Sequence, residues 1–234
     1  MIDELNKIIK KSNNIVFFGG AGVSTESGIP DFRSVDGLYN QKYDYPPEII
    51  LSHNFFFNKP KEFYKFYFDK LVNTNIMPND CHKKLKELED AGKLKAIITQ
   101  NIDGLHEKAG SKNVITIHGT IYKYHCTKCN KEYKLDDIFG KEIPTCTCSG
   151  LIKPDVVLYG EPLNDNDYVS AIKHLSEADT LIVGGTSLNV YPAAGLINYF
   201  NGKNLIVINK EKLKVDCTLQ INEPIGEVFR KIKD

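Results

Sequence analysis

Arginine is scarce in this chain of 234 residues: only Arg33 and Arg230 are arginine, and lysine supplies the other basic side chains. Lysine cannot replace arginine where a planar guanidinium has to hold an anion or a carboxylate through two parallel hydrogen bonds. Arg33 lies in a glycine-rich stretch, which makes it a candidate for such a contact. A structural ion pair is the alternative interpretation of this residue.

The chain also lacks net charge, long apolar runs and a leader-like beginning. Its 30 basic and 30 acidic residues cancel, so no overall field favours nucleic acid or an anionic membrane as a partner. A membrane span requires about 18 consecutive apolar residues, and no run in the chain is that long. Met1–Leu5 does not show the basic and then apolar pattern with which a secretory signal peptide begins. We therefore expect a soluble cytoplasmic protein, and its 41% hydrophobic and 26% charged residues are typical of globular chains.

Six cysteines in a cytoplasmic chain indicate metal binding or free thiols rather than disulfides. Four of them form two close pairs, Cys126-x-x-Cys129 and Cys146-x-Cys148, separated by sixteen residues. Paired thiolates on two turns suit a tetrahedral zinc ion, and four thiolates leave no open coordination position, so we predict one structural zinc. Free thiols or a reactive pair are the alternatives.

Short apolar runs alternate with segments of helical length, without internal repeats or low-complexity linkers. Helices are expected at residues 3–12, within 48–72 and at 79–92. The expected strands are 15–18, 95–99, 114–117, 155–159, 180–183 and 204–208. This alternation predicts an α/β fold with a doubly wound parallel sheet.

Polar residues follow the carboxyl end of each predicted strand, where open parallel sheets bind ligands. These clusters are Gly19–Gly22, Gln100–Asp103, His118, Gly160–Glu161, Gly184–Ser187 and Asn209. The glycine turn leads toward a helix and is expected to offer free backbone amides to a phosphate. A dehydrogenase would have glycine at position 25, where this chain has threonine, so a dinucleotide is favoured and hydride transfer is not.

Several sequence motifs together resemble those of the sirtuins, and they follow one another in the order of that family over residues 15–209. They are Gly-Ala-Gly-x-Ser-x-x-Ser-Gly-Ile-Pro-Asp-Phe-Arg (20–33), Thr-Gln-Asn-Ile-Asp-x-Leu-His (99–106), His-Gly (118–119), the two cysteine pairs, Lys-Pro-Asp-Val-Val-x-Tyr-Gly-Glu (153–161) and Gly-Thr-Ser-Leu-x-Val-Tyr-Pro-Ala (185–193). The chain departs from the family pattern at Lys153, where arginine is frequent, and in the single spacer of the second cysteine pair.

The resemblance implies a Rossmann-like NAD-binding domain (1–33, 73–118 and 153–234), a cofactor loop and helical insertion (34–72) and a zinc-binding module (119–152). It also implies that NAD⁺ is consumed as a co-substrate: an acyl group passes from a lysine side chain to ADP-ribose, and nicotinamide is released. The expected function is thus NAD-dependent protein-lysine deacetylation. A mono-ADP-ribosyltransferase and a non-catalytic NAD-sensing or interaction module are the alternatives.

The resemblance further assigns roles to individual residues. His118 would be the general base, with Asn101 orienting the ribose or a water molecule. Asp103 and the Ile102 backbone would bind the nicotinamide carboxamide, and Phe32 would shield the reacting face. The remaining NAD-binding residues would be Gly20, Ala21, Gly22, Thr25, Asp31, Arg33, Gln100, Thr186, Ser187, Asn209 and Ile225.

The partner implied is an acyl-lysine protein or peptide, and a monomer is the working expectation. The peptide would lie extended between 157–160 and 188–191, in contact with Val157, Leu158, Tyr159, Gly160 and Val190. Sirtuins that prefer acidic acyl groups carry Tyr-x-x-Arg in the helical insertion, whereas this chain has Tyr64 followed by Tyr67. We therefore expect acetyl or other uncharged acyl groups to be preferred over succinyl.

Overall fold

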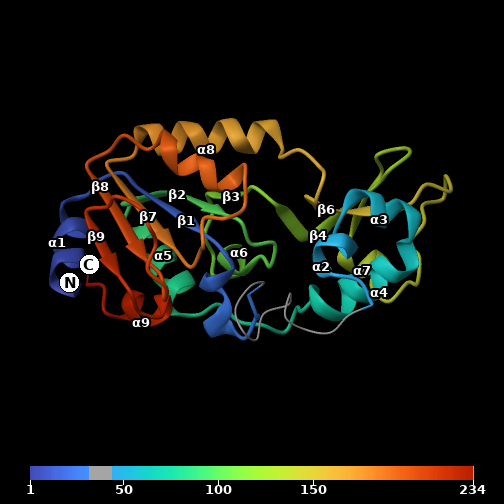
Figure 1. Ribbon diagram of the computed structural model, residues 1–234, viewed down its shortest axis with the longest axis horizontal. Coiled ribbons are helices and arrows are strands. Elements are labelled where there is room, and N and C mark those ends of the chain that lie inside the picture. The colour runs from blue at the N-terminus through green and yellow to red at the C-terminus, as the bar shows by residue number, and fades with distance from the viewer. Residues whose placement is uncertain (32–43, 234) are drawn as a thin grey trace.

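The computed structural model describes residues 1–31 and 44–233, which form two lobes (Figure 1). The larger lobe contains a six-stranded sheet in the order β3-β2-β1-β7-β8-β9, with parallel pairing throughout. The smaller lobe contains a three-stranded antiparallel sheet in the order β5-β4-β6. The predicted α/β fold with a doubly wound parallel sheet is therefore confirmed.

The elements follow one another along the chain with these bounds. The strands are β1 (Ile15–Gly19), β2 (Leu94–Thr99), β3 (Val114–Thr116), β4 (Gly119–Cys126), β5 (Glu132–Lys134), β6 (Ile152–Val156), β7 (Thr180–Gly184), β8 (Asn204–Ile208) and β9 (Leu219–Ile221). The α-helices are α1 (Ile2–Lys11), α2 (Pro47–Ile50), α3 (His53–Asn58), α4 (Pro60–Lys70), α5 (Asp80–Asp90), α6 (Leu105–Lys108), α7 (Leu135–Ile138), α8 (Asp165–Glu177) and α9 (Ile225–Arg230). Short 3₁₀ segments include η1 (Ala21–Val23), η2 (Thr25–Ser27) and η4 (Ala193–Tyr199).

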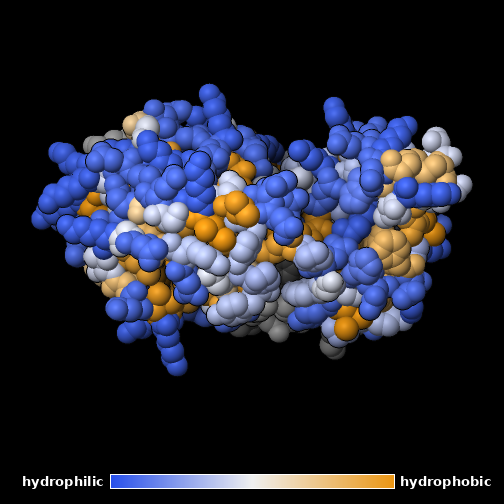
Figure 2. Space-filling model, turned by 90° about the horizontal axis from the view of Figure 1, so that it is seen from above, coloured by the Kyte–Doolittle hydropathy of each residue, from blue (hydrophilic) through white to orange (hydrophobic). Residues whose placement is uncertain are grey.

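Successive residues of the large sheet enter different hydrophobic cores. Ile15 and Phe17 of β1 join the core made with α1, α5 and α9, whereas Val16 and Phe18 join the core made with α8 and η4. Because helices cover both faces, every residue of β1 is buried, which explains its unbroken apolar run. The face that carries α8 is largely hydrophilic on its outside (Figure 2).

The parallel register brings the ends of the central strands to one level. Gly19 at the end of β1 is opposite both Thr99 of β2 and Gly184 of β7. Gly184 is in turn opposite Ile208 of β8. The polar residues that follow these strands therefore lie along one edge of the sheet, as the sequence predicts.

Helix α5 shows how local sequence sets the bounds of an element. The Asn79 side chain accepts hydrogen bonds from the amides of Cys81 and His82 and so caps the first turn. Gly92, with φ of +72°, follows the last turn in the left-handed region that glycine tolerates best. Leu85 and Leu88 are buried, so the predicted helix over 79–92 is confirmed with slightly narrower bounds.

The helical insertion and the small sheet share one core. The rings of Phe63, Tyr64 and Tyr67 on α4 are fully buried, and they pack in the same cluster as Tyr124 of β4. Pro60 begins α4, because the first helical position has no need of a backbone N–H. The aromatic residues of the insertion thus serve mainly as a core.

The strand predicted at 155–159 is wrong in bounds and in sheet. It is observed as β6, Ile152–Val156, paired antiparallel with β4 in the small sheet. Gly160–Glu161 therefore follows the small sheet rather than the edge of the large one. The predicted domain bounds stay a prediction, and Phe32, Arg33 and most of the predicted cofactor loop lie outside the described residues. Within the described ranges, no helix has the length and apolar character of a bilayer span.

Candidate active site and metal centre

The glycine-rich turn after β1 forms two short 3₁₀ segments, η1 and η2, where the sequence predicts an α-helix. The Gly20 amide donates to the Gly184 carbonyl over 3.2 Å, and the Gly22 amide donates to the Gly185 carbonyl over 2.8 Å. The expectation of free amides is therefore wrong for these two glycines. Their N–H groups join the turn after β1 to the turn after β7, because the two strands are neighbours in the sheet.

The same glycines are required by close packing. A Cβ on Gly20 would lie 2.8 Å from the Thr186 Cβ, and a Cβ on Gly22 would lie 2.8 Å from the Gly185 Cα. No side chain larger than hydrogen fits at either position. Since the strand order reverses between β1 and β7, this contact lies at the switch point where doubly wound folds bind their ligands.

Two half-buried side chains of the loop after β2, Asn101 and Asp103, form a polar triad with buried Ser24 of the turn after β1. The Ser24 hydroxyl donates to the Asp103 carboxylate over 2.6 Å and accepts from the Asn101 side-chain amide over 3.1 Å. Ser24 is 1% exposed, so its hydroxyl connects the two predicted site residues away from solvent. Sequence reasoning assigned Ser24 no role, although it stands in the quoted Gly-Ala-Gly-x-Ser motif.

Asp103 is an ionisable group held in a half-buried position. Burial raises the pKa of its carboxyl from the ordinary value, and hydrogen bonds from the Ser24 hydroxyl and the Leu105 amide oppose this shift. The Leu105 amide donates to Asp103 Oδ1 over 2.9 Å, which leaves Oδ2 for Ser24. Gly104 makes this turn possible, because its φ of +71° lies in the left-handed region that glycine tolerates best. A side chain at this position would also be excluded by packing, since a Cβ there would lie 2.5 Å from the Tyr122 ring.

His118, between β3 and β4, has a defined tautomer. Its Nδ1 lies 3.1 Å from the Gln100 carbonyl oxygen, and a carbonyl only accepts, so Nδ1 carries the proton. The neutral ring then has its basic lone pair on Nε2. Burial lowers the pKa of His118, although the bond to Gln100 opposes the shift, so the ring is neutral at pH 7 and suited to act as a base.

The other predicted NAD-binding residues lie in several different environments. Gln100 donates from Nε2 to the Thr186 hydroxyl over 3.1 Å and so connects the loops that follow β2 and β7. Asn209 lies at the end of β8, where its side-chain amide donates to the Glu211 carbonyl over 2.9 Å. Ile225 is 3% exposed and belongs to the hydrophobic core, against Gly184. The remaining members are half-buried Ala21, Thr25, Ile102 and Asp31, exposed Ser187, and Phe32 and Arg33 outside the described residues.

The predicted peptide-binding segment 157–160 is already bonded along its backbone. The Val157 amide donates to the His118 carbonyl over 3.0 Å, which ties this segment to the proposed base. The Tyr159 amide donates to the Leu51 carbonyl, and the Tyr159 carbonyl accepts from the His53 amide, both over 2.9 Å. One side of the segment thus pairs with the helical insertion. Leu158 is buried, Gly160 is exposed and Val190 is half-buried.

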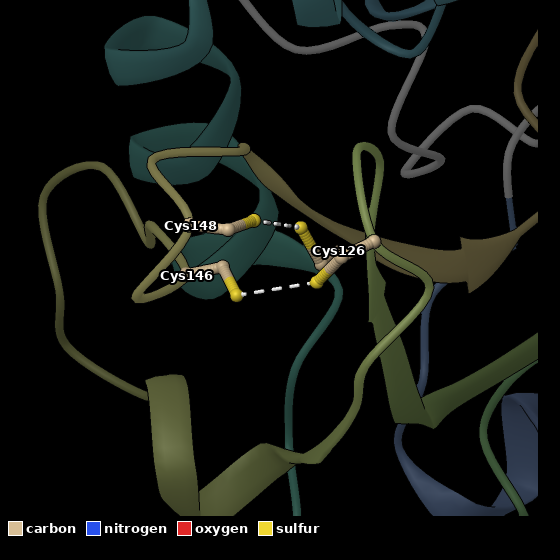
Figure 3. Close-up of side chains that lie close together, drawn as sticks. Cys126, Cys146 and Cys148 are labelled. Atoms are coloured by element: carbon tan, nitrogen blue, oxygen red, sulfur yellow. Dashed lines mark hydrogen bonds between the residues drawn. The ribbon is translucent and has the colours of Figure 1, made fainter.

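The four paired cysteines converge in the small lobe (Figure 3). Their sulfur atoms all lie within 4.8 Å of one another; Cys126 and Cys148 are 3.4 Å apart, and Cys129 and Cys146 are 3.6 Å apart. A tetrahedron of thiolates at about 2.3 Å from zinc has sulfur–sulfur edges of about 3.8 Å. The four side chains therefore fit one structural zinc ion.

Two tight turns bring the cysteines together. Cys126–Asn130 closes through a bond from the Asn130 amide to the Cys126 carbonyl, and the second turn closes through a bond from the Cys146 amide to the Gly150 carbonyl. A Cβ on Gly150 would lie 2.5 Å from the Cys126 sulfur, so only glycine fits beside this ligand. The second turn accommodates the single spacer between its cysteines without displacing either sulfur from the cluster.

Comparison with known proteins agrees with this arrangement. The Sir2 family model matches residues 20–192. The NAD-dependent protein deacetylase of Clostridium perfringens is 57% identical over 240 residues, covering 100% of this chain and 98% of that protein. The protein of the same name from Staphylococcus aureus (strain COL) is 42% identical over 236 residues, covering 99% of this chain and 97% of that protein.

Solved structures give the same result. A structure described as Sir2 bound to acetylated peptide has a TM-score of 0.89 and 36% identity, covering 99% of this chain and 97% of that chain. One described as Sir2–p53 peptide–NAD⁺ has a TM-score of 0.88 and 37% identity, covering 99% and 96%. Fold, cysteine cluster and sequence similarity over nearly the whole length agree, and the chain belongs to the Sir2 family.

Proposed function

We propose that the chain is an NAD-dependent protein-lysine deacetylase, which transfers the acyl group of a lysine side chain to ADP-ribose and releases nicotinamide. The observation that carries this proposal is the neutral His118 with its proton fixed on Nδ1, held at the switch-point edge of the sheet by Gln100. The relatives named NAD-dependent protein deacetylases, up to 57% identical, support the same activity.

His118 acts as the general base. Because Nδ1 is bound to the Gln100 carbonyl, the ring can accept a proton only at Nε2. We assign this nitrogen the removal of a proton from a ribose hydroxyl, which prepares that oxygen to receive the acyl group. Bound NAD⁺ supplies the ADP-ribosyl acceptor and nicotinamide as the leaving group.

The polar triad of Ser24, Asn101 and Asp103 binds the nicotinamide end. Ser24 holds the Asp103 carboxylate in a fixed orientation, from which Asp103 can accept a hydrogen bond from a carboxamide N–H. Asn101, held by the same hydroxyl, orients the ribose or a water molecule. The Ile102 carbonyl accepts from the Ile121 amide over 3.0 Å, so this backbone is fixed before any ligand arrives.

Other residues along the same edge of the sheet bind the remainder of the dinucleotide. Ala21, Thr25 and Gln100 lie at the diphosphate and ribose side, and Thr186, Ser187 and Asn209 lie toward the adenosine. Gly20 and Gly22 contribute close backbone approach, since their amides are bonded to the neighbouring turn. Phe32 and Arg33 keep the roles that the family resemblance gives them, and Ile225 contributes packing at the adenine end.

The acyl group preferred by this site is uncharged. In place of the arginine of the acidic-acyl sirtuins stands Tyr67, which is fully buried in the core of the small lobe. The Tyr64 hydroxyl donates to the Ile152 carbonyl. A succinyl carboxylate would lack a bidentate arginine partner here. We expect higher kcat/KM on acetyl-lysine than on succinyl-lysine peptides, and a preference for succinyl would contradict this assignment.

The zinc ion holds the small lobe together and takes no part in the reaction, since four thiolates fill its coordination sphere. Such a site requires reduced cysteines, and all six cysteines are free of disulfides. A reducing compartment maintains this state, which supports a cytoplasmic location.

Product analysis tests the proposed activity. The protein is incubated with NAD⁺ and an acetyl-lysine peptide, and the products are identified by mass spectrometry. We expect free nicotinamide, deacetylated peptide and O-acetyl-ADP-ribose. ADP-ribose attached to protein would instead indicate a mono-ADP-ribosyltransferase, and the absence of nicotinamide release would indicate a non-catalytic NAD-sensing module.

A further inference from the structure

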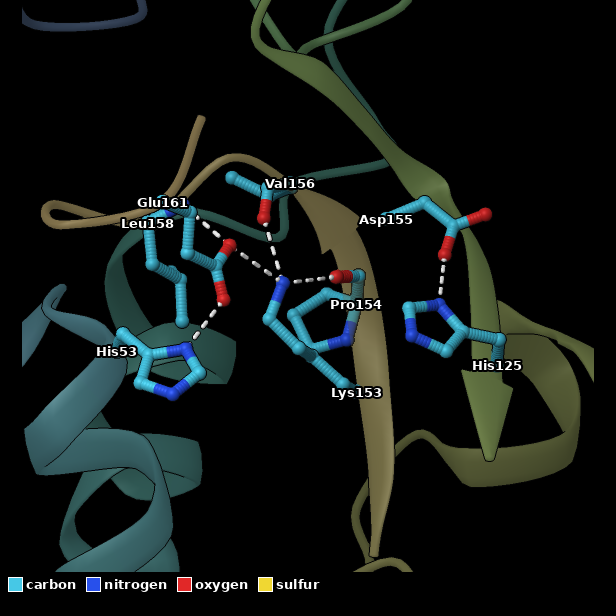
Figure 4. A network of polar contacts seen from close by, with 8 residues as sticks. All are labelled: His53, His125, Lys153, Pro154, Asp155, Val156, Leu158 and Glu161. Atoms are coloured by element: carbon cyan, nitrogen blue, oxygen red, sulfur yellow. Dashed lines mark hydrogen bonds and ion pairs between the residues drawn. The ribbon is translucent and has the colours of Figure 1, made fainter. Parts of the chain in front are cut away.

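A polar network at the base of the small lobe is centred on Lys153 (Figure 4). Lys153 lies on β6 and is only 8% exposed. Its Nζ donates to the carbonyls of Pro154 (3.2 Å) and Val156 (2.9 Å), and forms an ion pair with Glu161 over 2.9 Å. Three oxygen partners compensate the burial of this ammonium group. The ammonium group in turn holds these oxygen atoms in place.

Glu161 joins three elements through its two carboxylate oxygens. Oε2 accepts from the Leu158 amide over 2.9 Å in addition to Lys153, and Oε1 lies 2.9 Å from His53 Nδ1 on α3. The Glu161 amide also donates to the Leu158 carbonyl over 2.9 Å, which closes a turn around Tyr159 and Gly160. Lys153, Glu161 and His53 are together called the polar clamp.

The charge state of Glu161 suits this role. Burial would raise the pKa of its carboxyl, but hydrogen bonds from His53, the Leu158 amide and Lys153 outweigh burial and lower the pKa below its ordinary value. The carboxylate is therefore ionised at neutral pH and keeps its acceptor oxygens for these donors. The His53 ring, at the outer side of the clamp, has 47% of its side chain exposed and lies 4.7 Å from the Phe57 ring.

We infer that Glu161, held by Lys153 and His53, is a positioning residue for the protein substrate. The clamp fixes the backbone of residues 157–160 in the shape against which the acyl-lysine segment lies, so that little ordering is left for the moment of binding. This inference rests on the proposed function. It predicts that the clamp governs peptide affinity, whereas His118 and the polar triad govern the chemical step.

The test is steady-state kinetics of Glu161→Gln and His53→Gln. Glu161→Gln should raise KM for an acetyl-lysine peptide about tenfold, a change of about 1.4 kcal/mol in apparent binding free energy. The kcat at saturating peptide and the KM for NAD⁺ should stay within about twofold. His53→Gln, on the exposed side of the clamp, should shift the peptide KM in the same direction by a smaller factor.

A neighbouring pair provides the matched control. His125 Nδ1 lies 2.5 Å from the Asp155 carboxylate on the same small sheet, and in Figure 4 this pair lies on the other side of β6 from the clamp. His125→Gln should leave the peptide KM unchanged. If Glu161→Gln folds poorly because Lys153 is left unpaired, the double variant Lys153→Met, Glu161→Gln removes both charges and should still show the raised peptide KM.

The outcomes separate the two proposals. A merely structural role for the clamp would lower the active fraction, so kcat would fall at an unchanged peptide KM, and this result would overturn the inference. The inference would also be overturned if the wild-type protein deacetylates the peptide and the Glu161 and His53 variants have the same peptide KM as the wild type. If the wild-type protein releases no nicotinamide and deacetylates nothing, the proposed function itself fails and the inference with it.

Discussion

Replacing Ser24 by alanine removes one hydroxyl from the centre of the proposed site. This hydroxyl donates to Asp103 over 2.6 Å and accepts from the Asn101 amide over 3.1 Å. Ser24 is 1% exposed, so water cannot readily replace the lost group. Asp103 would keep its bond from the Leu105 amide and lose its only side-chain donor among those observed in the described residues.

The expected effect follows from the charge on Asp103. A hydrogen bond to a charged acceptor is worth about 1.5–3 kcal/mol, which corresponds to about a 10- to 150-fold loss in kcat/KM for NAD⁺. The variant should also shift the pH dependence. Burial already raises the pKa of Asp103 and the Ser24 bond opposes this, so its loss raises the pKa further. The acid limb of the pH–rate profile should therefore move to higher pH.

The assay is kcat/KM for NAD⁺ at saturating acetyl-lysine peptide, measured across pH for wild type, Ser24→Ala and Ser27→Ala. Ser27 lies in the adjacent 3₁₀ segment and accepts from the Asn79 side chain over 3.0 Å, so its variant controls for loosening of the turn. Ser27→Ala should retain activity. A Ser24→Ala enzyme within twofold of wild type, with an unshifted acid limb, would refute the assignment of the triad.

Two further predictions concern stability and the metal. Burial lowers the pKa of His82 to about 4 and that of His106 well below its ordinary value. The neutral forms of both rings stabilise the fold above about pH 6.5, and this stabilisation is lost as pH falls. From pH 7 to 5 the free energy of unfolding should drop by about 2 kcal/mol for His82, and the loss at His106 adds to this drop. Urea denaturation should show this drop, and an equal drop in the double variant His82→Asn, His106→Gln would contradict it. Gly150→Ala places a methyl group 2.5 Å from the Cys126 sulfur and should lower zinc content by atomic absorption. Gly140→Ala has open space around its Cβ but a φ of +78°, so it controls for backbone strain in the same lobe and should retain zinc; equal zinc in both would contradict the packing argument.

Five strands of the large sheet, β1, β2, β3, β7 and β8, were predictable from sequence because the central ones are buried on both faces, whereas the short edge strand β9 was not predicted. Each of the five reads as a short apolar run, and Gly19 and Gly184 mark where two of them end. The cysteine cluster was predictable because ligand spacing in two turns is a local property. The same holds for α5, whose cap at Asn79 and stop at Gly92 lie within one stretch of chain.

Pairing across long distances in the chain could not be read from local patterns. Strand β4 is only partly buried and mixes polar with apolar residues, so its pairing with β6 gives no strong periodic signal. The Gly22 amide seemed free because its acceptor, Gly185, comes from another turn far along the chain. The role of Ser24 could not be predicted for the same reason, since its partner Asp103 is 79 residues away in the sequence.

His118→Ala tests the central claim most directly, with nicotinamide release and deacetylated peptide followed together and zinc content measured on the same sample. Because a positioned general base contributes about 10²- to 10⁴-fold, we expect turnover to fall by at least about 100-fold while zinc content stays that of the wild type. Deacetylation within a few fold of the wild-type rate would show that His118 is not the base and would contradict the account.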